Sequence, residues 1–380
     1  MFISLSFYGI VIFFYFFIRF IFHRLNKPYK EEVSKSFSII IPVFNEKPDI
    51  FRRCIESCAM QLTEDSEIIV VADADKSCYN IACEYANKNP KIKVIYHEER
   101  KGKRVAHATA LKYAKGEIIV TVDSDTILYA DAIKELLKPF ADPTIGAVTG
   151  LVKVYNRDEN ILTRLLNIRY IMAGIFDRGS YSYFKVVNCT SGPFSAYRRS
   201  IFLKVLHEYV HQTHRNRICT FGDDRCLTNL ILKSGYNVFY QKTAVCETLI
   251  PSDFKTWLKQ QLRWCRSFWR ESWITLHYCW RRSKYLTFGT IMDCALPFLC
   301  ISSLVFAIFN GIVSASTFVF FPYMLSTIGM AFLRNFRYFE ITKKVDYFII
   351  PLYAILYIFV LLPLSLYALF TTNSVSWMTR

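Results

Sequence analysis

The sequence predicts an α/β domain, with a mostly parallel sheet and helices on both faces, combined with transmembrane and interfacial α-helices. Short β-branched runs alternate with amphipathic stretches in the middle of the 380-residue chain, a pattern typical of parallel sheets. Long apolar stretches lie at both ends, and 53% of the residues are hydrophobic. Lys and Arg number 47 against 31 Asp and Glu, which gives a formal net charge of +16. This composition excludes a disordered chain and a small disulfide scaffold.

The N-terminal segment, residues 1–30, is predicted to be a membrane anchor. Residues 2–22 are almost continuously apolar and long enough to cross a hydrocarbon core of about 30 Å. The segment shows no small-residue cleavage site, so we expect a retained helix and not a cleaved signal. The cations near the end of the apolar stretch and after it predict a cytoplasmic location for the next domain; they are Arg19, Arg24, Lys27 and Lys30.

Residues 36–250 are predicted to form the α/β domain. The expected strands cover residues 37–43, 67–71, 92–96 and 117–122, and helical patterns between them cover 49–60, 77–87 and 104–115. In parallel sheets of this kind, ligands bind beyond the carboxyl ends of the strands. Candidate functional residues should therefore directly follow each strand.

Polar or aromatic motifs do follow all four strands. Residues 44–46 follow the first, Asp73 and Asp75 end the second, the basic turn 100–104 follows the third, and residues 123–125 (Asp-Ser-Asp) follow the fourth. Each motif alone is better explained as a turn, a helix cap or a solvated basic face. Four of them at one sheet edge favour a binding site.

The chemistry of these motifs suits the binding of a nucleoside diphosphate. An Asp-x-Asp pair supplies hard oxygen ligands for Mg²⁺ or Mn²⁺ held together with a diphosphate, and a basic turn at a helix start suits phosphate. The sequence has neither the Gly-rich loop of nucleotide triphosphatases nor the Gly-x-Gly-x-x-Gly of dinucleotide folds. The motifs together indicate a nucleotide-sugar site.

The C-terminal part is predicted to meet the membrane. Residues 251–284 form an aromatic, basic and interfacial stretch that contains Gln260, Arg263 and Trp264. The tryptophans of this stretch are expected to belong partly to an interfacial belt, with Trp264 as an exception. Residues 285–380 contain two spanning candidates, 286–313 and 317–333, and a third apolar stretch at 347–370. Pro351 and Pro363 interrupt that third stretch, so it is either a kinked span or a re-entrant or interfacial segment.

Several motifs in this order resemble a known family. They are Asp-x-Asp at 123–125, Asn-Cys-Thr-Ser-Gly-Pro at 188–193, Gly-Asp-Asp at 222–224, Gln-x-x-Arg-Trp at 260–264 and the final Trp-Met-Thr-Arg at 377–380. The set resembles the membrane-integrated, inverting family-two glycosyltransferases of GT-A fold. Within that group the chain is most similar to hyaluronan synthases, and next to the related chitooligosaccharide synthases.

The resemblance implies a donor site. It places Phe44 and Asp73 on the uracil ring, with Asp75 as an alternative to Asp73, and it places Lys103 and Arg104 near the uridine diphosphate. Phe44 departs from the Tyr that is usual in the family, so stacking is kept and a hydroxyl contact is lost. The metal and donor motif falls on Asp123 and Asp125, with Asp125 as the direct ligand of Mg²⁺ or Mn²⁺.

The resemblance also implies an acceptor site. In the pair Asp223 and Asp224, it makes Asp224 the general base that deprotonates the acceptor hydroxyl; an inverting enzyme needs one such base. The resemblance also implies that further residues bind the acceptor or the diphosphate, namely Gln260, Arg263, Trp264 and Cys189. It places Trp377 and Arg380 at the cytoplasmic active site. Met378 replaces the Gly of hyaluronan synthases, which shifts the tail toward the chitooligosaccharide relatives.

The predicted function is a processive membrane glycosyltransferase that makes hyaluronan from UDP-GlcNAc and UDP-GlcA and exports it. The alternative is a chitin or chitooligosaccharide synthase that uses UDP-GlcNAc alone. A membrane channel with a degenerate sugar-nucleotide domain is disfavoured, because Asp125, Asp224 and Arg263 are all present. Nucleic-acid binding is disfavoured because no binding motif accompanies the positive charge. The expected partners are the UDP-sugars, a growing polysaccharide and the lipid bilayer of the cell membrane.

Overall fold

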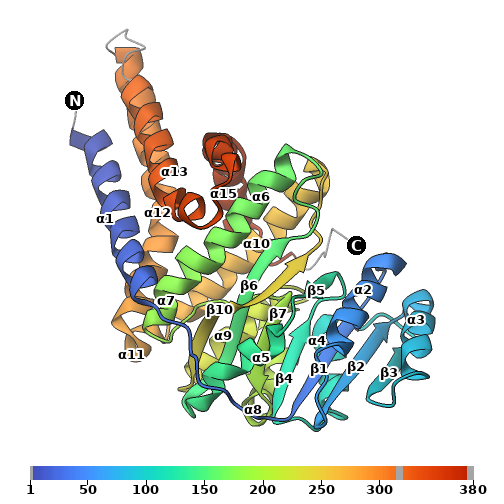
Figure 1. The fold of residues 1–380 in the computed structure, drawn as a ribbon. Helices are drawn as coiled ribbons and strands as arrows, with labels where there is room; N and C mark the ends of the chain where they lie inside the picture. The colour runs from blue at the N-terminus through green and yellow to red at the C-terminus, as the bar shows by residue number, and fades with distance from the viewer. Residues whose placement is uncertain (1–2, 314–319, 375–380) are drawn as a thin grey trace.

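The computed structural model describes residues 3–313 and 320–374. An α/β body carries one large sheet, and helices α1 (Ile3–Leu25), α12 (Lys284–Val313) and α13 (Phe320–Thr342) project from one side of it (Figure 1). The mostly parallel α/β sheet predicted from the sequence is confirmed.

The first half of the sheet follows the predicted alternation of strand and helix. Its strands are β1 (Phe37–Val43), β2 (Ser66–Asp73), β3 (Ile92–His97) and β4 (Ile118–Val122). The helices between them are α2 (Pro48–Ala59), α3 (Lys76–Ala86) and α4 (Lys103–Leu111). β1 pairs in parallel with both β2 and β4, and β2 pairs in parallel with β3. All four strands therefore end at one edge of the sheet.

The second half of the sheet completes an eight-stranded order, β3-β2-β1-β4-β7-β6-β10-β5. The added strands are β5 (Thr126–Leu128), β6 (Ile145–Val154), β7 (Phe194–Arg198) and β10 (Asn237–Thr248). β7 runs antiparallel to its neighbours β4 and β6, whereas β6 and β10 are parallel. A separate small hairpin is formed by β8 (Thr213–His214) and β9 (Arg217–Ile218).

Both faces of the sheet are buried, which explains why the strands read as continuous apolar runs. Along β1, Ile39 and Ile41 belong to one core cluster and Ile40 to the other, because successive side chains of a strand point to opposite faces. α2, α3 and α5 (Ala132–Leu137) contribute to the first cluster. α4, α8 (Arg199–Val210) and α9 (Asp223–Lys233) contribute to the second.

A set of helices lies between the sheet and the projecting helices. It comprises α6 (Ile161–Met172), a π-helical turn at Ala173–Arg178, α7 (Gly179–Tyr183), α10 (Phe254–Leu276) and α15 (Leu362–Phe370). α15 lies along α10, and Trp269 on α10 donates a hydrogen bond from Nε1 to the Ser365 carbonyl at 2.8 Å. Trp257 is fully buried and Trp273 is exposed. The tryptophans of residues 251–284 therefore divide between core and surface.

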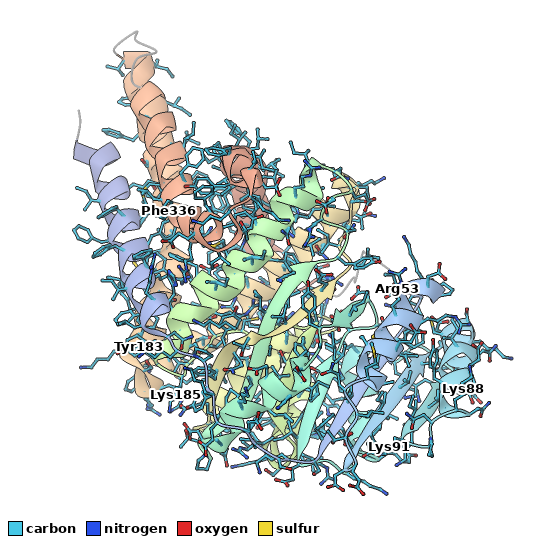
Figure 2. All side chains as sticks on the ribbon, in the orientation of Figure 1. Arg53, Lys88, Lys91, Tyr183, Lys185 and Phe336 are labelled. Atoms are coloured by element: carbon cyan, nitrogen blue, oxygen red, sulfur yellow. The ribbon has the colours of Figure 1, made fainter. Side chains whose placement is uncertain are left out.

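Among residues 3–313 and 320–374, three segments are long and apolar enough to cross a membrane, namely Tyr8–Leu25, Lys284–Val313 and Val345–Phe370. The third is helical but irregular, with α14 (Ile350–Leu356), a π-helical turn at Tyr357–Leu361 and then α15. Pro351 and Pro363 lie in the first turns of α14 and α15, where the missing N–H is tolerated. Figure 2 shows Lys88 and Lys91 on the body and Phe336 on the projecting helices.

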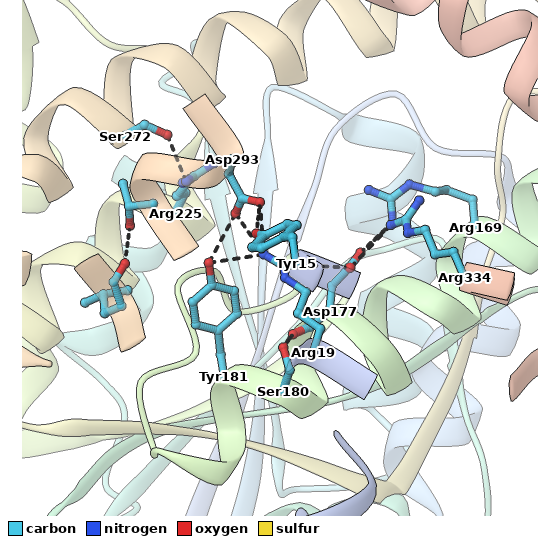
Figure 3. A network of polar contacts seen from close by, with 12 residues as sticks. Tyr15, Arg19, Arg169, Asp177, Ser180, Tyr181, Arg225, Ser272, Asp293 and Arg334 are labelled. Carbon is cyan, nitrogen blue, oxygen red and sulfur yellow. Dashed lines mark hydrogen bonds and ion pairs between the residues drawn. The ribbon is translucent and has the colours of Figure 1, made fainter. Parts of the chain in front are cut away.

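A polar network joins the projecting helices to the body (Figure 3). Asp177 in the π-helical turn accepts ion pairs from Arg19 at 3.0 Å, Arg334 at 3.1 Å and Arg169 at 3.2 Å. Arg19 also pairs with Asp293 on α12 at 2.9 Å. Arg19 is buried and is neutralised by both carboxylates, whereas Arg334 and Asp177 are partly exposed. A buried cation requires such a partner.

Candidate active site

The four predicted motifs meet at one sheet edge because they follow parallel strands. Asp73 at the end of β2 is buried and organises the basic turn. Its two carboxylate oxygens accept the backbone N–H groups of Lys101 at 2.8 Å and Gly102 at 2.7 Å. The His97 ring nitrogen Nδ1 lies 2.9 Å from the same carboxylate. Asp73 thus fixes the turn from which α4 begins.

Asp75, the alternative to Asp73 for the uracil ring, caps α3. One of its oxygens accepts the Cys78 N–H at 2.9 Å, and the other accepts the Asn45 N–H at 2.7 Å. Asp75 therefore joins the turn after β1 to the turn after β2. Both candidate uracil-binding carboxylates hold backbone, and Asp73 is the more buried of the two.

Phe44 is half-buried at the end of β1, and its ring is covered by a cation. The Arg100 guanidinium carbon lies 3.9 Å from the ring centroid, a cation–π contact. The flat surface predicted to stack on a base is therefore present, and Arg100 lies over it. Sequence reasoning grouped Arg100 only with the basic turn.

Lys103, the first residue of α4, connects the donor motif to the second acidic pair. Its ammonium lies 2.6 Å from Asp123 Oδ1 and 3.1 Å from Asp223 Oδ2. Burial alone lowers the pKa of Lys103, but the charges of Asp123 and Asp223 outweigh burial and raise it above its usual value. Lys103 is thus a permanent cation between the two acidic motifs.

Arg104, the next residue, points elsewhere. Its guanidinium donates to the carbonyl of Tyr209 at 2.7 Å, to Gln212 Oε1 at 2.8 Å and to the carbonyl of Phe221 at 3.4 Å. Arg104 is 5% exposed. The side chain expected near the uridine diphosphate therefore holds the loop before α9 in this structure.

Asp123 and Asp125 follow β4 and offer carboxylate oxygens at the sheet edge. Asp125 accepts a hydrogen bond from Thr248 Oγ1 at 3.0 Å, and Asp123 pairs with Lys103. Within residues 3–313 and 320–374, no three His, Cys, Asp or Glu side chains gather as a metal cage. Two carboxylates nevertheless fit Mg²⁺ or Mn²⁺, because such ions complete their shell with water and substrate phosphates.

Asp223 and Asp224 begin α9, directly after Gly222 in the left-handed region at φ 76°. Burial, followed by the charge of Asp223, raises the pKa of Asp224 to about 6. Burial also opposes ionisation of Asp223, but Lys103 holds the pKa of Asp223 well below its usual range. A pair of acids whose pKa values are moved apart is typical of an acid–base site.

The loop before β7 brings Cys189 next to Asp224. The thiol Sγ lies 3.9 Å from Asp224 Oδ2, and the Cys189 carbonyl accepts a hydrogen bond from Arg178 Nε at 2.9 Å. Burial and the charge of Asp224 raise the pKa of Cys189 to about 12, so the thiol stays protonated. A small pocket here is lined by Lys103, Gly192, Tyr197, Asp223 and Asp224, among others.

α10, which packs against α12 and α15, carries the Gln-x-x-Arg-Trp residues. Gln260 and Arg263 are half-buried, and Trp264 is 42% exposed. The Trp264 ring lies 6.1 Å from that of Tyr170 on α6. Burial and the charge of Asp125 raise the pKa of Tyr170, whereas Arg263 is among the cations that lower it. Tyr170 therefore lies beside Trp264 of α10 and within electrostatic reach of Asp125.

Sequence reasoning missed Tyr170 and Arg178. Both lie in an apolar helical stretch without a recognisable motif, and only their proximity to Asp125 and Cys189 identifies them. Trp377 and Arg380 lie outside the described residues. Thr371, close before them, accepts a hydrogen bond from Arg266 Nε at 3.1 Å, and the hydroxyl of Thr372 lies 3.1 Å from His214 Nε2.

The fold and the site together define a glycosyltransferase of GT-A type. The family model of glycosyl transferase family 2 matches residues 38–206. Hyaluronan synthase from Streptococcus pyogenes is 34% identical over 384 residues, covering 99% of this chain and 91% of that protein. The chain belongs to the family-two glycosyltransferases, in the group that contains the hyaluronan synthases.

Two further similarities are to a curated relative and to a solved structure. An N-acetylglucosaminyltransferase from Azorhizobium caulinodans is 33% identical over 357 residues, covering 90% of this chain and 86% of that protein. The solved structure of the mannosyltransferase PcManGT from Pyrobaculum calidifontis, in complex with GDP-Man and Mn²⁺, has a TM-score of 0.64 at 16% identity. The structural alignment covers 97% of this chain and 98% of the mannosyltransferase chain. The structural likeness confirms the fold.

Proposed function

We propose that this chain polymerises UDP-activated sugars by inverting transfer at the cytoplasmic face of the cell membrane and exports the product. The product we propose is hyaluronan, made from UDP-GlcNAc and UDP-GlcA. The observation that carries the proposal is the 34% identity to a hyaluronan synthase over 99% of the chain. The arrangement of acids and cations around Lys103 supports it.

The donor binds at the carboxyl edge of the sheet. Phe44 stacks on the uracil ring, and Asp73 or Asp75 accepts a hydrogen bond from its N–H. Lys103 and Asp123 face the diphosphate, and Arg104 is a third candidate. Asp125, with Asp123, would hold Mg²⁺ or Mn²⁺. When bound, such an ion neutralises the charge that develops on the leaving diphosphate.

Asp224 performs the acid–base step. Its carboxylate takes the proton of the acceptor hydroxyl while that oxygen attacks the anomeric carbon. The bond from this carbon to the diphosphate oxygen breaks, and UDP leaves with the bonding electron pair. A pKa near 6 leaves Asp224 largely ionised at pH 7, yet basic enough to accept a proton. Asp223 stays ionised beside Lys103 and orients that cation.

The acceptor lies between Asp224 and α10. Cys189 contributes a neutral thiol beside the base, and Trp264 offers a flat, half-exposed surface on which a sugar ring can stack. Arg263 offers a two-pronged donor to phosphate oxygens, and Gln260 lies one helical turn before it. We extend the acceptor and nucleotide site to Trp377 and Arg380 on the strength of the family motif.

A second candidate function is the synthesis of chitin-type oligosaccharides from UDP-GlcNAc alone. It is favoured by the 33% identity to the N-acetylglucosaminyltransferase of Azorhizobium caulinodans. The Met378 departure from the Trp-Gly-Thr-Arg motif of hyaluronan synthases points the same way. The two candidates share the donor nucleotide and the base, and they differ in whether UDP-GlcA is a substrate.

A product assay separates the two candidates. Purified protein in Mg²⁺ or Mn²⁺ receives labelled UDP-GlcNAc, with and without UDP-GlcA. We expect polymer only when both donors are present, digestible by hyaluronidase, and no product after EDTA treatment. Polymer that forms from UDP-GlcNAc alone and is digested by chitinase would establish the second candidate instead.

A further inference from the structure

The carbonyl of Phe221 is held by two buried arginines from different helices. Arg270 on α10 donates from Nη2 at 2.6 Å, and Arg104 on α4 donates from Nη2 at 3.4 Å. Phe221 directly precedes Gly222, and Asp223 and Asp224 follow. The two guanidinium groups therefore act on the peptide from which the base-bearing helix begins.

The same two arginines are joined through a closed circuit of hydrogen bonds. Arg104 donates to Gln212 Oε1 at 2.8 Å, and Gln212 Nε2 donates to Glu271 Oε1 at 2.9 Å. Arg270 Nε donates to the same Glu271 oxygen at 3.0 Å. We call these residues, Arg104, Gln212, Phe221, Arg270 and Glu271, the Phe221 clamp.

The Phe221 clamp is buried and tightly packed. Arg104, Arg270 and Glu271 are 5%, 3% and 0% exposed. Buried charges of this kind are tolerated only when they are paired and hydrogen-bonded. A Cβ at Gly222 would lie 2.4 Å from Ser267 Oγ and 2.7 Å from Arg270 Nη2. Glycine is therefore favoured at position 222 for two reasons. Its backbone is left-handed, and a side chain there would clash with Ser267 and Arg270.

We propose that Arg104 and Arg270 are positioning residues that fix the Phe221–Gly222 turn and thereby the direction of Asp224. The clamp links α4, which supplies Lys103, to α10, which supplies Arg263 and Trp264. It therefore fixes the relative positions of the helices that carry the donor, base and acceptor residues. This inference rests on the proposed role of Asp224 as the base, and it assigns Arg104 a role other than contact with the diphosphate.

The two roles of Arg104 predict different kinetics. A diphosphate ligand contributes to nucleotide binding, so its loss raises the dissociation constant of UDP. A residue that positions the base acts on the chemical step, so its loss lowers kcat and leaves UDP affinity unchanged. A displacement of about 1 Å of a catalytic group can cost on the order of a hundredfold in rate.

The test compares Arg104→Met and Arg270→Met with their conservative forms, Arg104→Lys and Arg270→Lys. Arg198→Met serves as the matched control. Arg198 also holds backbone carbonyls, those of Phe140, Asp142 and Ile145. It lies where β7 pairs with Ile118 at the start of β4, away from the edge that carries Asp123.

Three quantities are measured in detergent-solubilised full-length protein: kcat for sugar transfer, the dissociation constant of UDP, and amide hydrogen exchange of residues 221–225. We expect both Met variants to lose about tenfold or more in kcat while UDP affinity stays within about twofold. Amide exchange at residues 221–225 should accelerate in both Met variants, and the Lys variants should recover part of kcat. Arg198→Met should leave all three quantities unchanged, even where it lowers the stability of the protein.

Weakened UDP binding in Arg104→Met would overturn the inference in favour of a diphosphate contact. Unchanged kcat, or unchanged exchange at residues 221–225, would overturn it as well. A wild-type chain that transfers no sugar would instead refute the proposed function. In that case the exchange rates would still decide whether the clamp holds the turn.

Discussion

The residues around Lys103 show how one cation can set the chemistry of three carboxylates. Lys103 contacts Asp123 and Asp223 directly, and its charge is among the influences that lower the pKa of Asp224. Asp223 stays ionised, and Asp224 is left with a pKa of about 6. The two neighbouring acids of α9 therefore differ in basicity although they share one helix turn.

Substitution Lys103→Met tests this electrostatic balance. Removal of the cation favours the protonated form of Asp224, so its pKa rises. Because the ionised carboxylate is the proposed active form, the acid limb of the kcat profile should move from near pH 6 to higher pH. The measurement is kcat at saturating donor between about pH 5 and pH 9.

Lys101→Met is the control for Lys103→Met, because the exposed Lys101 side chain belongs to the same turn and Asp73 is bound by its backbone N–H. The control should leave the acid limb unchanged. An acid limb that stays in place, or moves to lower pH, in Lys103→Met would contradict the balance described here.

At the scale of helices, the membrane-side elements are fixed by ion pairs inside the protein. Asp177, in the π-helical turn after α6, receives Arg19 from α1, Arg334 from α13 and Arg169 from α6. The next residue, Arg178, donates to the Cys189 carbonyl. The turn therefore connects the projecting helices to the loop beside Asp224.

Substitution Asp177→Asn should destabilise the protein strongly. The change removes a carboxylate that pairs with three arginines, of which Arg19 is buried. Breaking a fully buried ion pair costs about 3–5 kcal/mol, which is an upper bound for this partly exposed carboxylate. The thermal unfolding midpoint in detergent should fall well below that of wild type. Asp158→Asn, at an exposed pair with Arg157, should leave the midpoint nearly unchanged. Equal midpoints for the two variants would show that the network is not structural.

Much of this fold could be predicted from the sequence. The predicted strands at 37–43 and 92–96 match β1 and β3 to within one residue at each end, because buried parallel strands leave continuous β-branched runs. The gathering of Phe44, Asp73 and Asp123 at one edge followed from parallel pairing. Contacts such as Arg104 with the Phe221 carbonyl could not be predicted, since hydrophobic periodicity carries no information on pairing between distant segments.

Over the whole molecule, which carries a formal net charge of +16, several of the cationic side chains lie inside the protein. Arg19 and Arg334 pair with Asp177, Lys103 lies between acids in the site, and Arg104 and Arg270 hold the backbone near Asp224. The remaining excess suits the flanks of membrane segments and an interfacial stretch near anionic lipids.

The side of the membrane reached by the end of the chain can be measured directly. Thr371 and Thr372 contact Arg266 and His214 of the catalytic body, so a cysteine introduced by Ser374→Cys should lie on the cytoplasmic side. An impermeant thiol reagent should label it in inverted membrane vesicles and not in intact cells, above the background of the wild-type chain. Labelling in intact cells would place this end outside.

Sugar transfer is expected to depend on Asp224 at the start of α9, and the substitution Asp224→Asn isolates this dependence. The amide keeps the size of the side chain but cannot accept the proton of the acceptor hydroxyl. We predict that the variant binds UDP with wild-type affinity and has lost at least about a hundredfold in transfer rate. Transfer at the wild-type rate in this variant would contradict the account.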